Sequence, residues 1–214
     1  ELTIDFDHLR DVVRITTRFL DNVIDANSYS VIEIEEMTRE TRKIGLGVMG
    51  FADMLARMRI PYDSEDGLKI GRSIMKFIME ESDQMSIELA EQRGAFPAYP
   101  GSIYDTPEQP IMRNACRLTV APTGTISMIA NCSSGIEPLF ALCYHKHNIL
   151  GGETLLYVDQ GFEKAAQDNG FYSTDLMTYL ANGGSLQDRD DVPKWAKQVF
   201  VTSSDISPQM HVKM

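Results

Sequence analysis

Apolar residues recur at three- and four-residue steps in two long segments of the first half of the chain. In the first segment, between Asp7 and Asp25, they stand at Leu9, Val12, Val13, Phe19, Leu20 and Val23. In the second they stand at Leu68, Ile74, Phe77, Ile78, Met85 and Leu89. This spacing places apolar side chains on one face of a helix. The pattern therefore predicts a helix over 7–25 and a longer one from the capping residue Ser64 to about Arg93, ended by Gly94.

Between these two helices lies a charged, helix-prone run, 33–43, which we expect to continue through Ile44–Leu55. Its glycines at 45, 47 and 50 spell Gly-x-Gly-x-x-Gly. A dinucleotide fingerprint would need a preceding strand and an acidic residue about twenty positions later in a second strand. A helix-favouring run precedes these glycines, and no such acidic residue follows. We interpret them as small residues that let a helix pack closely on its neighbours.

The second half of the chain predicts shorter and mixed elements. Residues 95–112, rich in proline and glycine, indicate an irregular surface loop. The remaining predictions are a buried strand at 117–121, a short helix at 126–130, a strand at 139–145, a turn at Gly151-Gly152, an apolar segment at 155–158, helices at 162–168 and 175–180, and a helix that begins at Ser207-Pro208. The pattern indicates an α/β fold with long helices and no internal repeat.

Composition narrows the class of protein. The 214 residues are 43% hydrophobic and 24% charged, which fits one globular domain over residues 1–214. No apolar run approaches the roughly 20 residues that cross a bilayer, and nothing at the start has the pattern of a signal peptide, so we expect no membrane association and a cytoplasmic location. The net charge of −11, without a basic patch, argues against nucleic acid as a partner.

Cysteine and histidine do not predict a metal site. Cys116, Cys132 and Cys143 include no Cys-x-x-Cys pair, which argues against a disulfide framework and a zinc site and favours buried free thiols. His145 and His147 would share one face of a strand, but no third ligand is evident nearby.

The segment 119–138 carries the most chemistry. An apolar strand enters a turn of Pro122, Thr123 and Gly124, and a helix starts at once. Free N–H groups at a helix start, the helix dipole and nearby hydroxyls of Thr123, Thr125 and Ser127 suit a phosphate or pyrophosphate. The alternative is an ordinary strand–helix turn with its hydroxyls as caps. Glu137 is held extended because a proline follows it. Beside a phosphate loop its carboxylate would be repelled by the ligand unless it accepts a hydrogen bond from a sugar hydroxyl or a backbone N–H.

These residues resemble a known family. Ala121-Pro-Thr-Gly-Thr-Ile-Ser127, followed by Cys132-Ser-Ser-Gly-Ile-Glu-Pro-Leu-Phe-Ala141, is similar to the signature of the cobalamin-dependent (class II) ribonucleotide reductase catalytic subunits. The segments 19–25, 38–55 and 206–214 agree in sequence, order and spacing. The resemblance covers nearly the whole chain.

The resemblance implies a fold and a set of functional residues. The fold would be part of the ten-stranded α/β barrel of the ribonucleotide reductase and glycyl radical enzyme type. The substrate's phosphates would bind at Thr123, Gly124, Thr125, Ile126 and Ser127, with Pro122 and Glu137 lining the active site. The complete enzyme would use a protein thiyl radical to replace the 2′-OH of a ribonucleoside di- or triphosphate by hydrogen. It would take adenosylcobalamin as cofactor and a thioredoxin-like reductant.

The sequence also departs from the family pattern. The Asn-x-Cys-x-Glu finger loop that carries the thiyl cysteine does not occur in these residues, and none of the three cysteines matches a catalytic one. Tyr144-His-Lys146 and Gly151-Gly152 stand where relatives usually read Tyr-x-Arg and Asp-Gly. We therefore expect a fragment, inactive alone, that needs the remainder of its catalytic subunit. The alternatives are a fragment of an iron- or manganese-dependent (class I) catalytic subunit and a non-catalytic nucleotide-binding or interaction module.

Overall fold

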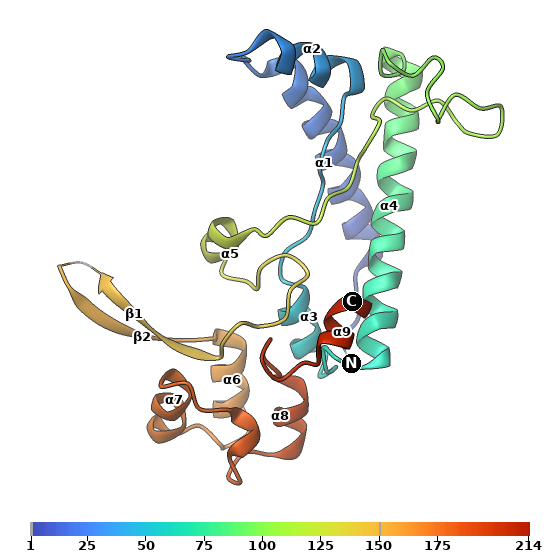
Figure 1. Cartoon of the computed structure of the whole chain (residues 1–214). Coiled ribbons are helices and arrows are strands. Elements are labelled where there is room, and N and C mark those ends of the chain that lie inside the picture. Colours follow the sequence, from blue (N-terminus) through green and yellow to red (C-terminus); the bar gives the residue numbers. More distant parts are fainter. Residues whose placement is uncertain (1, 150) are drawn as a thin grey trace. The chain divides into compact units, whose positions relative to one another are not determined.

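The computed structural model describes residues 2–149 and 151–214, and the contacts within it divide the chain into two compact units. The first, here called the helical unit, comprises Ile4–Gly47 and Arg72–Ala121. The second, called the site unit, comprises Val48–Gly71 and Pro122–Met214 with a few N-terminal residues. Figure 1 labels the elements of both units along the chain.

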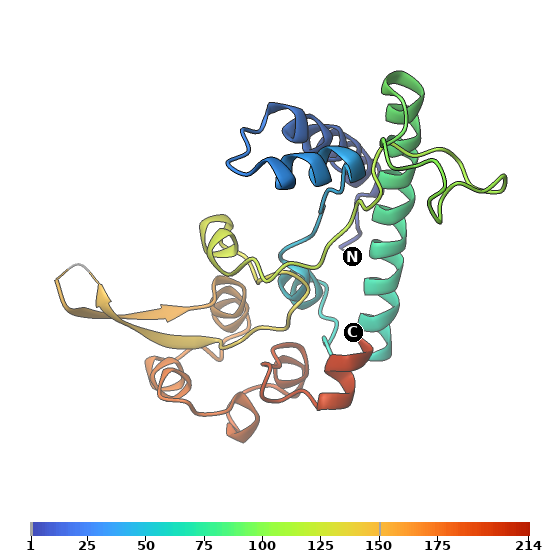
Figure 2. The ribbon, with the colours of Figure 1, turned by 45° about the horizontal axis from the view of Figure 1, so that its top comes forward.

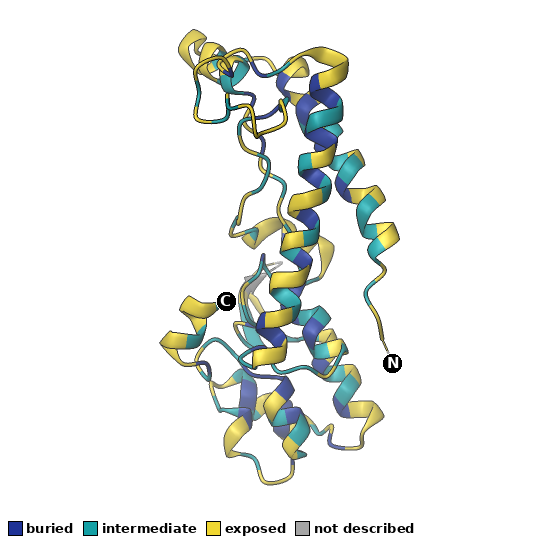
Figure 3. Cartoon of the chain, turned by 90° about the vertical axis from the view of Figure 1, so that its right-hand side faces the viewer, coloured by how far each residue is buried: buried dark blue, intermediate teal, exposed yellow. Residues whose placement is uncertain are grey.

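The helical unit is built on two long helices that were predicted from their apolar spacing. α1 covers Phe6–Ala26 and α4 covers Glu65–Arg93, with its first turns in the site unit. The two helices lie side by side, since the rings of Phe6 and Phe77 are 4.9 Å apart and Arg14 binds Glu88 at 2.6 Å. Buried and exposed positions alternate along α4 (Figure 3), as its amphipathic sequence requires. α2, at Ile32–Thr41, confirms the helix expected from the charged run.

A buried network of charges lies inside the helical unit. Asp21 of α1 is fully buried and Arg42, just after α2, is 4% exposed. The Asp21 carboxylate accepts hydrogen bonds from Arg42 Nε at 2.9 Å, Arg93 Nη1 at 2.9 Å and Asn114 Nδ2 at 3.0 Å. Ser86 in turn donates to Asn114 Oδ1 at 3.0 Å. The network therefore joins α1, the end of α2, α4 and the segment before residue 117.

The glycine-containing segment is extended rather than helical, so the expectation of a continuous helix through Ile44–Leu55 is wrong. Ile44 N–H donates to Cys116 O at 2.9 Å and Leu46 N–H to Arg117 O at 2.7 Å, which forms a short parallel pairing. A Cβ at Gly47 would lie 2.9 Å from the backbone oxygen of Thr119. The glycines do permit a close approach, but between two extended segments. A separate helix, α3, follows at Phe51–Arg57.

The predicted buried strand at 117–121 is also not found in that form. Only Leu118 forms a bridge, and Val120 is 64% exposed. In the described part of the chain, the backbone hydrogen bonds of this segment to the 44–46 segment end at Thr119, so the pairing is too short to form a strand. The 95–112 segment is irregular, as expected, but it is not all surface because Phe96 and Tyr99 are buried.

The site unit combines a β-hairpin with short helices. Strands β1 (Cys143–Ile149) and β2 (Glu153–Val158) pair antiparallel, and Gly151 and Gly152, at φ of 97° and 102°, supply the predicted turn. The hairpin stands out from the helices that follow it (Figure 2). These helices are α6 (Gln160–Asp168), α7 (Thr174–Ala181), a 3-10 turn (Leu186–Asp188), α8 (Lys194–Val199) and α9 (Pro208–Lys213).

The helices around the hairpin share one apolar core. Phe162, Leu176 and Ala196, from α6, α7 and α8, are each 0% exposed. The predicted helices at 162–168, 175–180 and after Ser207 are confirmed, whereas α8 was not predicted. The strand expected over 139–145 begins at Cys143, and Leu139 forms only an isolated bridge with Thr202.

Candidate functional site

The turn before α5 (Gly124–Ala130) leaves the start of that helix uncapped. Thr123, the N-cap residue, adopts a left-handed conformation at φ 54° and makes no side-chain cap hydrogen bond. Its Oγ1 instead accepts from Gly135 N–H at 2.7 Å. The N–H groups of Gly124, Thr125 and Ile126 donate to no described residue, and all three residues are exposed. Three adjacent backbone donors therefore face solvent at the positive end of a helix.

The hydroxyl of Ser127 points into the protein rather than toward these donors. Ser127 is 2% exposed, and its Oγ donates to Gly124 O at 3.2 Å and lies 2.9 Å from Ser134 Oγ. The hydroxyls of Thr123 and Ser127 thus hold the loop that follows α5, while the hydroxyl of Thr125 is exposed. Of the five predicted phosphate ligands, Gly124, Thr125 and Ile126 present free amides.

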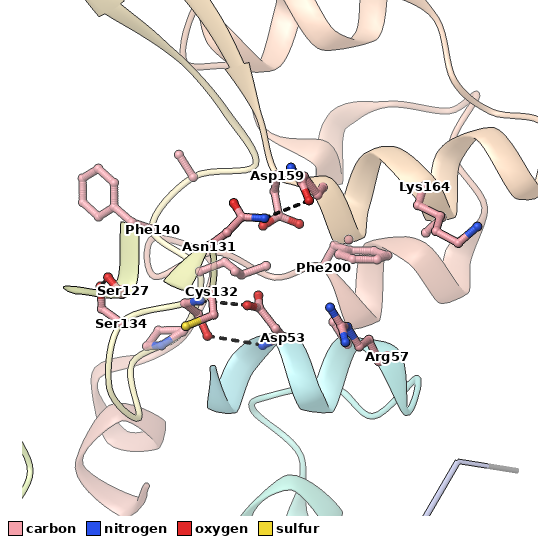
Figure 4. A pocket seen from close by; sticks show the side chains of 18 of the residues that line it. Asp53, Arg57, Ser127, Asn131, Cys132, Ser134, Phe140, Asp159, Lys164 and Phe200 are labelled. Carbon is pink, nitrogen blue, oxygen red and sulfur yellow. Dashed lines mark hydrogen bonds between the residues drawn. The ribbon is translucent and has the colours of Figure 1, made fainter. Parts of the chain in front are cut away.

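The loop that engages these hydroxyls is also fixed to the start of α3. Gly50 N–H donates to Ser133 O at 2.8 Å, and Ser133 N–H donates to Asp53 Oδ2 at 2.8 Å. A longer contact of 3.4 Å joins Asp53 N–H to Ser133 Oγ. Figure 4 shows Asp53 projecting from α3 toward this loop beside Cys132. No local sequence pattern indicates this contact, because its two partners are 80 residues apart.

A cavity of about 620 Å³ lies beside this loop, within the site unit. Its walls come from α3, α5, the loop after α5, the hairpin base and α6 (Figure 4). Of the predicted site residues, Gly124, Ser127 and Glu137 line it, whereas Pro122, Thr123, Thr125 and Ile126 do not. The volume is in the range of small-molecule sites.

The cavity has cationic and aromatic walls that the sequence did not indicate. Arg57, Arg59 and Lys164 line it, and the Arg59 guanidinium lies 4.6 Å from the centre of the Trp195 ring. Lys164 is paired with Asp168 at 3.0 Å. Such walls suit a ligand with an anionic group and a planar or apolar part.

Two acidic residues that line the cavity, Asp159 and Glu137, differ in burial and in hydrogen bonding. Asp159 caps α6, accepting from Phe162 N–H at 2.8 Å, and burial raises the pKa of its carboxyl. Glu137 is exposed, and no hydrogen bond to its carboxylate is found among the described residues. The pKa of Tyr62 is raised to about 12, mainly by the burial of Tyr62 itself and secondly by the charge of Glu137. The Tyr62 hydroxyl donates to Ile136 O at 2.7 Å.

The cysteines differ in exposure, and the expectation that all three are buried is wrong. Cys116 is exposed, Cys132 is intermediate and Cys143 is buried. Burial raises the pKa of the Cys143 thiol to about 12 and also raises the pKa of Cys132, to which the charge of Asp53 adds. Two of the thiols are therefore held in the protonated form, which is not the nucleophile.

His145 and His147 both lie on β1. The rings of His145 and His147 are 6.1 Å apart, and His147 Nδ1 lies 3.0 Å from Thr154 Oγ1. Within residues 2–149 and 151–214, no group of three or more His, Cys, Asp or Glu side chains could hold a metal ion. Over the same residues, no helix has the length and apolar character to span a bilayer.

Comparison with known proteins gives a consistent result over the full length of the chain. The family model for the ribonucleotide reductase barrel domain matches residues 1–112 and 108–214. A vitamin B12-dependent ribonucleoside-diphosphate reductase from Thermoplasma acidophilum is 51% identical over 99% of this chain, and one from Mycobacterium tuberculosis is 41% identical over 99%. The chain spans 27% and 30% of the lengths of these two relatives.

A solved structure agrees with the sequence comparisons. The class Id ribonucleotide reductase alpha subunit of Actinobacillus ureae matches 97% of this chain with a TM-score of 0.76 at 26% identity, over 39% of its own length. These matches confirm the resemblance and the barrel-type fold that it implied, of which these residues form a part. The chain belongs to the ribonucleotide reductase barrel-domain family.

Proposed function

We propose that the complete protein reduces ribonucleotides to deoxyribonucleotides and that this chain supplies the phosphate-binding turn of its active site. The observation that carries the proposal is the uncapped start of α5, where the amides of Gly124, Thr125 and Ile126 are exposed and have no acceptor among the described residues. Backbone donors at a helix start bind phosphate oxygens without a counter-charge on a side chain. Family membership supports a ribonucleoside di- or triphosphate as that anion, and the relatives' names favour the diphosphate.

Each predicted residue takes a role that its geometry supports. Gly124, Thr125 and Ile126 donate from the backbone to phosphate oxygens, and the exposed hydroxyl of Thr125 adds a fourth donor. Thr123 and Ser127 hold the loop around the turn through Gly135 and Ser134. Pro122 begins the turn. Glu137, on the rim of the cavity, is free to accept a hydrogen bond from a substrate hydroxyl.

We assign no residue of this chain to radical chemistry. Cys143 is buried with its pKa raised to about 12, the pKa of Cys132 is raised, and Cys116 lies in the helical unit. The thiyl cysteine and the cysteines that become oxidised belong, in this proposal, to the remainder of the catalytic subunit. A thioredoxin-like protein would re-reduce them, in the cytoplasm, where thiols are kept reduced.

Adenosylcobalamin is proposed for the complete enzyme from the names of the relatives at 51% and 41% identity. When bound, this cofactor supplies the radical that oxidises the active-site thiol. The described residues offer no cluster of metal ligands, so no residue here is assigned to the cobalt. The class Id alpha subunit of Actinobacillus ureae, 26% identical, supports a class I catalytic subunit as the second candidate. Turnover of the purified complete protein with adenosylcobalamin and without a metal-bearing second subunit would support the cobalamin class; a requirement for that subunit would contradict it.

The phosphate site is tested by Thr125→Glu in the complete protein. A carboxylate in the first turn of a helix interacts favourably with the helix dipole, so it does not destabilise the helix, but it repels a bound phosphate. We therefore expect the KM for the ribonucleotide to rise at least about tenfold, with no fall in melting temperature. Thr174→Glu is the matched control, because Thr174 is exposed in the first turn of α7 and does not line the cavity. An unchanged KM for Thr125→Glu would contradict the proposed site.

A further inference from the structure

The start of α3 lacks the usual arrangement for a helix N-terminus. Its N-cap is Gly50, which has no side chain, and the acidic residue at the third helical position is Asp53. In a capping box, such an acid turns back to the N–H of the N-cap residue. Here Gly50 N–H donates instead to Ser133 O, at 2.8 Å, and the Asp53 carboxylate accepts from Ser133 N–H, also at 2.8 Å. A loop distant in sequence therefore occupies the place of the capping box.

Ser133 lies next to the residues that hold the phosphate-binding turn. Ser134 Oγ contacts Ser127 Oγ at 2.9 Å, and Gly135 N–H donates to Thr123 Oγ1 at 2.7 Å. Three successive residues, 133 to 135, thus make contact with α3 and with both ends of the turn. Since Gly135 engages the Thr123 side chain, that side chain does not cap α5.

From these contacts we propose that Asp53 is a positioning residue for the phosphate-binding turn, holding Ser133 so that Ser134 and Gly135 keep the α5 amides free for substrate. The inference rests on the proposed phosphate site. Asp53 itself lines the cavity beside the turn (Figure 4) but acts through Ser133 and need not touch substrate. Its bond to Ser133 N–H is charge-assisted, and such bonds are about twice as strong as neutral ones.

The test compares Asp53→Ala and Asp53→Asn in the complete enzyme. Asp53→Ala removes the acceptor, so we expect the KM for the ribonucleotide to rise roughly tenfold or more while kcat changes little, because ground state and transition state lose the same phosphate contacts. Asp53→Asn keeps one acceptor oxygen and loses the charge, so its KM should rise only about threefold. Graded recovery of this kind is not expected from a residue that only stabilises the fold.

The matched control is Asp66→Ala. Asp66 also stands in the first turn of a helix, α4, but it pairs with Lys69 at the surface and does not line the cavity. Its replacement removes a carboxylate of the same type from the first turn of another helix, and we expect the KM to stay at the wild-type value. Melting temperatures of all variants separate loss of fold from loss of binding.

Each outcome decides the inference. If Asp53→Ala lowers the melting temperature but the folded enzyme keeps a wild-type KM, Asp53 is structural only and the inference is overturned. If Asp53→Ala does not fold, Asp53→Asn decides, since a wild-type KM there also overturns it. A raised KM for Thr125→Glu with an unchanged KM for Asp53→Ala contradicts this inference alone; an unchanged KM for both contradicts the phosphate site itself.

Discussion

Thr123 shows how one backbone angle changes what a residue does. A threonine at an N-cap normally has extended geometry and turns its hydroxyl onto the first N–H groups of the helix. At φ 54°, Thr123 faces Gly135 instead. A left-handed conformation costs a β-branched residue of order 1–3 kcal/mol, so it persists only where neighbouring contacts impose it. Here the 2.7 Å bond from Gly135 N–H is such a contact, and free amides on α5 are the result.

Cys143 leads to a prediction of thiol reactivity with pH. Burial, followed by the charges of Asp159 and Glu163, raises its pKa to about 12. At pH 8 only about one thiol in ten thousand would then be thiolate, against roughly one in four for an ordinary cysteine. We expect iodoacetamide to leave Cys143 unlabelled at pH 8 in the folded protein and to label it after unfolding in guanidinium, as mass spectrometry of the peptide would show. Rapid labelling of folded Cys143 at pH 8 would contradict the assignment.

At the scale of elements, the helical unit depends on Asp21 for the contacts among α1, α4 and the segments after α2 and before residue 117. Its carboxylate accepts hydrogen bonds from three side chains and is fully buried. Arg42 is 4% exposed and pairs with two carboxylates, Asp21 and Asp25. Replacing Asp21 would remove the buried one of these two partners. Removing one side of a buried ion pair costs far more than removing a surface pair, because the remaining charge is already desolvated.

Asp21→Ala should therefore destabilise the protein by about 3–5 kcal/mol. The measurement is urea unfolding followed by circular dichroism, comparing midpoints at equal slope. Asp7→Ala is the matched control, since Asp7 lies on the same helix, pairs with Arg10 and has a side chain 91% exposed. We expect the Asp7 variant to unfold at the wild-type midpoint. Equal midpoints for the two variants would show that the buried network contributes nothing beyond a surface pair.

The elements differ in how far their sequences predict them. α1 and α4 were predicted within a residue or two because their apolar spacing is a local property of long helices. The segment at 44–47 was misjudged because its extended form depends on Thr119, which is about seventy residues away. α8 was missed because it has six residues and its N-cap residue, Pro193, makes no side-chain cap hydrogen bond.

The site was predictable to a similar degree and for the same reason. The turn that we propose as the phosphate site was selected from its own threonines and glycine, and the family resemblance supplied its expected ligand. Neither the diversion of Thr123 to Gly135 nor the contact of Asp53 with Ser133 has a local signal. Both depend on the path of the 131–138 loop, which is fixed by contacts with α3 and α5 and not by its own sequence.

At the scale of the whole molecule, we expect part of the exposed surface of this chain to be covered by the remainder of the complete protein. The chain covers 27% of the length of a relative at 51% identity. Several large apolar side chains on and after α5 are exposed in the site unit: Ile126 at 54%, Met128 at 61%, Ile129 at 80% and Phe140 at 88%. Soluble proteins seldom expose neighbouring apolar groups of this size unless another surface covers them.

The isolated 214-residue chain should therefore bind the dye ANS more strongly, at equal molar concentration, than the complete protein, in which we expect the remainder of the barrel to cover these side chains. The double variant Ile129→Gln/Phe140→Gln should lower the ANS fluorescence of the isolated chain, because it replaces the two most exposed side chains of this group. Ile103→Gln is the control, since Ile103 is 82% exposed but lies in the helical unit and does not line the cavity. If the isolated chain and the complete protein bind ANS equally, these side chains are exposed in both, and the remainder of the subunit does not pack on α5.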